Sequence, residues 1–239
     1  MRKLLFILAL SWSLLASAEG LWQRAVINYS RHTYHSGNQN WQISQSKEGW
    51  MYFANNNGLL EFDGSTWNTF PLPGQAKVRS VRAVGDTVYV GALGQFGRFV
   101  RDTKGKMVYQ MLSDNTPDSA KINIWNIHQI GDDIYFQGDY ALYVNRGTAR
   151  EDCYAGIGYS AVVYNRLYAV SKQGVFLLVG GEFKRLEGID VSATSDIIGI
   201  LPYQNQLLLI TVKKGLFLYG NHELRPLKTA ADAIIHEGH

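Results

Sequence analysis

The sequence predicts an all-β fold, and three observations carry the prediction. A short apolar pattern typical of strands recurs along the chain, polar two-residue turns precede each copy, and no stretch shows the apolar spacing of a long helix. The composition agrees, because 14 Tyr and 24 Gly with only 18% charged residues suit short strands and tight turns. The length of the repeat then decides which all-β fold is expected.

The repeat unit is about 40 residues long. Its most regular part is an apolar triplet, and the central residues of the five triplets are 37, 46, 33 and 40 residues apart: Tyr52, Tyr89, Tyr135, Tyr168 and Leu208. One apolar strand precedes each triplet, and a third and a weaker fourth strand follow it. A single four-stranded sheet cannot cover both of its faces, so such units pack against one another. The sequence therefore predicts a β-propeller of four-stranded antiparallel blades.

Five blades and part of a sixth are expected. Their predicted bounds are about 40–70, 78–112, 124–150, 157–187 and 197–227, with the partial sixth blade at 230–239. Residues 19–39 precede the blades, and AVINYSRHTY at positions 25–34 predicts a spare strand that would close the ring. Since the sixth blade stops at its first turn, we expect an incomplete ring and an N-terminal fragment of a longer protein.

The first eighteen residues predict a signal peptide for export. A basic pair at positions 2 and 3 precedes the apolar run LLFILALSWSLL, and ASA at positions 16–18 supplies a cleavage site. The run is shorter than the roughly 20 residues of a membrane span. The expected location is the periplasm, and the alternative is an uncleaved N-terminal anchor.

Charge and cysteine content narrow the choice of partners. The formal net charge is +3, and two of the basic residues that contribute to it belong to the predicted signal peptide. That balance predicts that this segment binds no nucleic acid. Cys153 is the single cysteine, which excludes a disulfide within the chain and a thiolate metal cluster.

The first repeat carries a family resemblance. Positions 40–67, with the sequence NWQISQSKEGWMYFANNNGLLEFDGSTW, resemble the two-component-regulator propeller repeat. The shared elements are, in order, an inner strand, a first turn, an aromatic strand, an N-x-G-L turn and a final D-G. In this sequence they are Ile43, Lys47–Gly49, Tyr52-Phe53, Asn57-Gly58-Leu59 and Asp63-Gly64. The later repeats follow the same topology with different turn letters. The match is therefore specific over about 30 residues.

The resemblance implies a role in signalling. Such repeats form the periplasmic half of sensors in Bacteroidetes-like bacteria, followed by a triple-tyrosine domain, a membrane helix, and a histidine kinase or a LuxR-type helix-turn-helix. It implies that the intact protein is anchored in the inner membrane and regulates transcription. The downstream signalling domains are not in this sequence.

Catalytic and metal motifs do not emerge from the sequence. GxSxG, HExxH and phosphate-binding loops are missing. His32 and His35 would share a metal only on a helix, and we expect strand or loop there. We therefore predict no enzyme activity, no cofactor and no metal site.

A ligand-binding mouth is the expected functional site. Alignment of the repeats places two Trp, a Tyr and an Arg at the start of the inner strands, where they suit sugar rings. Loops between the second and third strands add polar groups that fix a ligand's orientation. The candidates are Trp41, Arg79, Trp125, Tyr159, Asn55, Asn56, Asn57, Gln95, Asp139, Tyr140, Lys172 and Lys213. The alternatives are packing between blades for the tryptophans and left-handed turn formation for the asparagines.

These observations lead to three functional hypotheses. The first is a periplasmic ligand-sensing module of a transmembrane receptor, recognising an oligosaccharide or another small periplasmic ligand. The second is a protein-interaction scaffold or homodimerisation platform that uses the same face. The third is a propeller glycoside hydrolase or lyase, which would need paired carboxylates near the axis.

Overall fold

The computed structural model describes residues 26–113, 122–147, 151–190, 192 and 196–229. The chain divides into two compact units, residues 1–34 and 35–239. In the described part of the first unit, residues 26–30 form no strand and α2 (Arg31–Tyr34) is a single helical turn. The expected spare strand is therefore wrong over these residues. The predicted signal peptide and the partial sixth blade lie outside the described residues.

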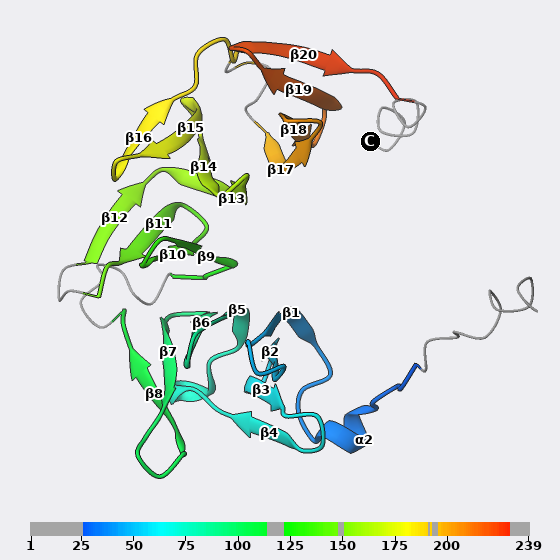
Figure 1. Cartoon of the computed structure of the whole chain (residues 1–239), viewed down its shortest axis with the longest axis vertical. Helices are drawn as coiled ribbons and strands as arrows, with labels where there is room; N and C mark the ends of the chain where they lie inside the picture. The colour runs from blue at the N-terminus through cyan, green and yellow to red at the C-terminus, as the bar shows by residue number, and fades with distance from the viewer. Residues whose placement is uncertain (1–25, 114–121, 148–150, 191, 193–195, 230–239) are drawn as a thin grey trace, which may run out of the picture. The chain divides into compact units, whose positions relative to one another are not determined.

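The described residues of the second unit form twenty strands in five four-stranded antiparallel sheets, each with its strands in sequential order or its reverse (Figure 1). Sheet one holds β1 (Asn40–Gln45), β2 (Met51–Asn55), β3 (Gly58–Phe62) and β4 (Trp67–Phe70). Sheet two holds β5 (Val78–Val84), β6 (Thr87–Ala92), β7 (Phe96–Arg101) and β8 (Met107–Met111). Sheet three holds β9 (Asn126–Ile130), β10 (Asp133–Gln137), β11 (Ala141–Asn145) and β12 (Glu151–Ala155).

Sheet four holds β13 (Ile157–Val163), β14 (Arg166–Ser171), β15 (Gly174–Val179) and β16 (Glu182–Arg185). Sheet five holds β17 (Ile197–Tyr203), β18 (Gln206–Thr211), β19 (Leu216–Gly220) and β20 (Glu223–Leu227). The 3-10 turn η1 (Pro73–Gln75) connects the first two sheets. The all-β prediction is confirmed, with one correction: the fourth strand of sheet three lies beyond the expected end of that blade at residue 150.

The hydrophobic core lies between neighbouring sheets. In the part of the chain that the structure describes, four clusters of buried side chains each draw on two successive sheets, so every adjacent pair shares one cluster. Between sheets one and two, for example, Tyr52 and Leu59 pack with Val88, Val90 and Phe99. This face-to-face packing is the architecture of a β-propeller, in which each sheet is a blade.

The first strands of successive sheets also contact one another. Side chains of β1 accept hydrogen bonds from the backbone of β5: Val81 N donates to Gln42 Oε1 at 2.8 Å and Ala83 N donates to Ser44 Oγ at 3.0 Å. Ser80 Oγ donates to the carbonyl oxygen of Ile124 at 3.0 Å. These bonds fix the positions of the first strands, on which the candidate site depends.

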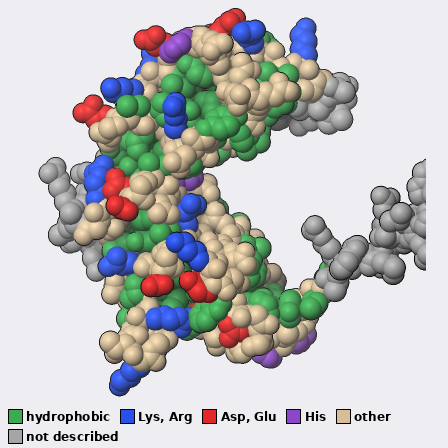
Figure 2. All heavy atoms as spheres, viewed as in Figure 1, with side chains coloured by type: hydrophobic (Ala, Val, Ile, Leu, Met, Phe, Trp, Pro, Cys, Tyr) green, Lys and Arg blue, Asp and Glu red, His purple; other side chains and the backbone are tan. Residues whose placement is uncertain are grey.

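The described residues contain no helix that is long and apolar enough to cross a membrane. On the face shown in Figure 2, basic and acidic side chains are interspersed over the sheets. Neither sign of charge dominates that face.

Candidate functional site

Three predicted residues from three sheets converge in one stack. The guanidinium carbon of Arg79 lies 3.9 Å from the ring centroid of Trp41 and 5.3 Å from that of Trp125. The two indoles meet edge to face, with centroids 6.1 Å apart and planes at 71°. We call these three residues the mouth stack.

Local backbone irregularity explains two of these placements. The register of β1 against β2 shifts between Asn40 and Gln42, and that of β5 against β6 shifts between Val78 and Ser80. Trp41 and Arg79 are the extra residues of these β-bulges. A bulge re-aims the side chain that it carries, so both residues leave the plain alternation of their strands. Trp125 lies directly before β9, and its backbone N–H donates to the carbonyl of Gln137 at 2.8 Å.

Each indole of the mouth stack is held by a loop side chain. Trp41 Nε1 donates to Asn56 Oδ1 at 2.9 Å, and Trp125 Nε1 donates to Asp139 Oδ1 at 2.6 Å. Both tryptophans remain 39% exposed. The stack therefore combines packing between blades with two oriented aromatic surfaces that solvent can reach.

Arg79 is the chemically unusual member of the stack. Its Nε and Nη1 atoms are buried and have no hydrogen-bond partner among the residues that the structure describes. Desolvating a cation is costly, and stacking on aromatic rings returns about 2 kcal/mol or more for a desolvated contact. A hydrogen-bond acceptor that reaches Nε or Nη1 would offset the remaining cost of desolvation.

Tyr159 does not share the position of the mouth stack. The register shift of β13 lies between Ile157 and Tyr159, so the bulge residue of sheet four is Gly158. Tyr159 therefore corresponds to the residue after the bulge, and the expected equivalence is wrong by one residue. The hydroxyl of Tyr159 accepts a 3.4 Å hydrogen bond from Ile200 N in the next sheet.

Two of the predicted loop residues have structural roles. Asn55 is fully buried; its Oδ1 accepts hydrogen bonds from Ser36 Oγ and Gly37 N, and its Nδ2 donates to Gly37 O. Its amide is therefore committed to the segment before β1, which contradicts a ligand contact. Gln95 is 8% exposed and its Nε2 donates to Pro73 O at 2.8 Å.

The asparagine run does not form a left-handed turn. Asn55, Asn56 and Asn57 all have negative φ, and the positive φ of 131° falls on Gly58. Asn56 positions Trp41, and Asn57 is exposed. Lys213 is exposed in the loop after β18 and lies outside the mouth stack and the cavities described below.

A cavity of about 230 Å³ brings four predicted residues together, and its lining comes from sheets four and five and from the chain after β10 and after β12 of sheet three. Asp139, Tyr140, Tyr159 and Lys172 line it, and we call it the slot. The Asp139 carboxylate connects the slot to the mouth stack, because it also holds Trp125. The sequence thus predicted these residues for one site, although it indicated no separate cavity.

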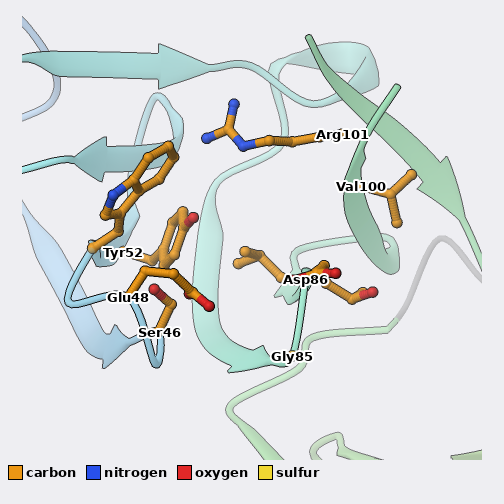
Figure 3. A pocket seen from close by; sticks show the side chains of 10 residues that line it. Ser46, Glu48, Tyr52, Gly85, Asp86, Val100 and Arg101 are labelled. Carbon is orange, nitrogen blue, oxygen red and sulfur yellow. The ribbon is translucent and has the colours of Figure 1, made fainter. Parts of the chain in front are cut away.

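Sequence reasoning missed a groove of about 390 Å³ between sheets one and two. Figure 3 shows Ser46, Glu48 and Tyr52 on one side of it and Gly85, Asp86 and Val100 on the other, with the Arg101 side chain reaching across towards Tyr52.

Beside this groove, Arg101 Nη2 lies 2.5 Å from Oε2 of Glu61, whose side chain is 3% exposed. The guanidinium also lies 4.5 Å from the ring centroid of Trp50. Burial, together with the charge of Glu61, raises the pKa of Tyr52 to about 12, so this phenol stays protonated at neutral pH. We interpret the cluster as a clasp between sheets one and two.

A hydrogen-bond chain joins sheets three and four. Ser160 Oγ donates to Gln137 Oε1 at 2.7 Å and lies 3.0 Å from His128 Nε2. Since the hydroxyl proton is already used, His128 donates from Nε2 as the neutral imidazole. Burial, helped by the charge of Arg82, lowers the pKa of His128 to about 4.

The described residues contain no group of three or more His, Cys, Asp and Glu side chains that could hold a metal ion. His32 lies in α2, so the expectation of strand or loop at that residue is wrong.

The geometry defines a β-propeller that carries an aromatic and cationic mouth. No family model matches the chain, and no curated protein matches it in sequence. Among solved structures, virginiamycin B lyase from Staphylococcus aureus is similar, with a TM-score of 0.61 and 16% identity over 82% of this chain and 73% of the lyase chain.

The extracellular domain of a hybrid two-component system from B. thetaiotaomicron is also similar, with a TM-score of 0.56 and 14% identity. The match covers 78% of this chain and 27% of that chain, so the chain spans about a quarter of that domain's length. YCF48 bound to D1 peptide gives a TM-score of 0.56 and 14% identity over 81% of this chain and 70% of that chain. At these identities the likeness establishes the shared propeller fold.

Proposed function

We propose that this chain is the ligand-sensing propeller module of an exported signalling receptor of the two-component-regulator propeller type. The mouth stack is the observation that carries the proposal, because it presents two partly exposed indoles around a guanidinium whose buried Nε and Nη1 have no hydrogen-bond partner among the described residues. The export pattern at the N-terminus and the repeat resemblance support it, as does the shared fold with a two-component extracellular domain.

The chemistry of the mouth favours a small polar ligand with apolar faces. Indole faces stack on the C–H faces of sugar rings, and the guanidinium edge donates to hydroxyl or carboxylate oxygens. An oligosaccharide meets both requirements. The module is proposed to bind rather than to turn over its ligand, and a signalling domain elsewhere in the intact protein would receive the conformational change.

The test is a thermal-shift screen of the full chain against a glycan panel. A glycan at 100 times its dissociation constant adds about 2.7 kcal/mol, which for a domain of this size is a rise in Tm of about 5–10 °C. We expect Trp41→Ala and Trp125→Ala to abolish the shift. Trp41→Phe keeps an aromatic face and should retain part of it.

Trp67→Phe is the matched control. Trp67 lies on β4, stacks on Phe62 with ring centroids 4.3 Å apart, and is not part of the mouth stack. It should leave the ligand-induced shift intact. A glycan whose shift survives both alanine variants would refute the mouth as its site. A panel with no shift on a cooperatively melting protein would refute the sugar ligand and favour a protein-binding platform.

A further inference from the structure

The slot exists because sheet four has a glycine where other sheets carry a side chain. The bulge residues of sheets one and two are Trp41 and Arg79, and that of sheet five is Ile198. Sheet four has Gly158 there, and a Cβ added to it would meet only the carbonyl oxygen of Asp139, at 3.8 Å. The space that a bulge side chain would fill is therefore open.

The lining of the slot combines buried apolar side chains with exposed polar ones. Val170 and Ile197 are each 5% exposed and contribute apolar surface. Gly156 and Gly158 line the slot without a side chain that would fill it. Tyr140 is 82% exposed, an unusual state for a large aromatic residue, and offers a flat face beside the cavity. This arrangement suits a ring with one apolar face.

The two charged groups of the rim are complementary. Asp139 accepts from Trp125 through Oδ1, and its Oδ2 has no hydrogen-bond partner within the described residues. Lys172 forms no ion pair within the same described residues. A carboxylate that accepts and an ammonium that donates can together bind adjacent hydroxyl groups, and their charges cancel.

We propose that the slot binds a single uncharged pyranose ring, with the ring stacked on Tyr140 and its hydroxyl groups between Asp139 and Lys172. The volume of about 230 Å³ is below the roughly 300–1,000 Å³ of sites for drug-sized ligands, which limits the occupant to one ring. The inference rests on the proposed sensing function and adds a subsite to it, since Asp139 links the slot to Trp125 in the mouth stack.

The experiment uses ligand-observed saturation-transfer NMR on the full chain. The probes are the methyl pyranosides of glucose, galactose and mannose, with methyl glucuronide as the charged comparison. Gly158→Trp places in sheet four the side chain that Trp41 supplies in sheet one, and it should weaken binding of the neutral probe at least about tenfold by filling the slot. The φ of Gly158 is outside the left-handed region, so the backbone tolerates the change.

Val162→Trp is the matched control, because it adds the same side chain to an exposed position of the same strand outside the slot. It should bind like the wild type, and so should Trp41→Ala. Equal binding by wild type and Gly158→Trp overturns the slot, and preference for the glucuronide overturns the neutral class. If no pyranoside binds while longer glycans still shift the melt through Trp41, the slot is wrong and the sensing function stands. If nothing binds in either assay, both fail.

Discussion

Removing Arg101 should cost more stability than its position at a strand end suggests. Arg101→Met leaves the Glu61 carboxylate, which is 3% exposed, without its cation. Breaking a buried ion pair by deleting one partner costs about 3–5 kcal/mol. Because the Arg101 side chain is 33% exposed, solvent screens part of the interaction between the two charges, and the expected cost lies at the lower end of this range. The contact with Trp50 is lost as well.

The expected change is a loss of about 3 kcal/mol, which corresponds to a fall in Tm of about 6–12 °C. Urea unfolding followed by tryptophan fluorescence measures it, and thermal melts give the second value. Arg98→Met is the matched control on the same strand, since Arg98 donates to the neutral Gln110 at 2.8 Å in an exposed pair. It should change stability by less than about 0.5 kcal/mol.

A double-mutant cycle with Glu61→Gln isolates the pair. The two substitutions together should cost less than the sum of the single ones by at least about 1.5 kcal/mol, because the double variant buries no lone charge. A coupling below about 0.5 kcal/mol, or equal losses in Arg101→Met and Arg98→Met, would refute the clasp.

Three further changes test the packing of the sheets. As the pH falls from about 6.5 to 4, His128 should lower the free energy of unfolding of the wild type by up to about 3 kcal/mol, because the imidazole takes up a proton more readily in the unfolded chain than in the folded one. Urea titrations at both pH values measure this loss, and the His128→Asn variant should show less of it. Gly58→Ala should cost about 3 kcal/mol, because φ is 131° there and the new Cβ would lie 2.3 Å from the carbonyl oxygen of Phe70; an unchanged urea midpoint would contradict this. Gly91→Ala should lower Tm by several degrees by pressing on Ile124 across the interface of sheets two and three, and a melt that matches the wild type would show that the interface yields.

The strands could be predicted from local pattern, whereas the turns were placed one residue late. In sheets four and five the polar pairs that precede the apolar triplets, and so predict the turns, are Asn165-Arg166 and Asn205-Gln206. The structure instead has Tyr164 and Asn165, and Gln204 and Asn205, at positive φ. A two-residue hairpin turn of type I′ needs positive φ at both central residues. The asparagine signal marks such a turn without telling which of the two positions it occupies.

The sequence predicted which residues form the candidate site, but it did not predict how they are arranged. Repeat alignment brought Trp41, Arg79 and Trp125 to one level, because equivalent strand positions share a face. Tyr159 was assigned wrongly because a bulge adds one residue to the count, and the sequence does not mark which residue is extra. Gly158, which opens the slot, was missed for the same reason.

The sequence contains one indication of the clasp between Glu61 and Arg101. Glu61 stands between Leu60 and Phe62 in a strand whose other residues are apolar, which indicates a buried charge in need of a partner. Its partner Arg101 is 40 residues away and belongs to the next sheet. The separation is one repeat, so only the packing of adjacent blades reveals the pair.

The sharing of each hydrophobic cluster between two sheets has a consequence for how the molecule opens. When two neighbouring sheets separate, the cluster that they share is exposed to water, so the free energy of opening is set by the interfaces between sheets. Amide exchange should then be slowest in sheets two to four, which share clusters on both sides within the described residues. The exchange rate should be higher in sheets one and five, each of which shares a single cluster within the described residues.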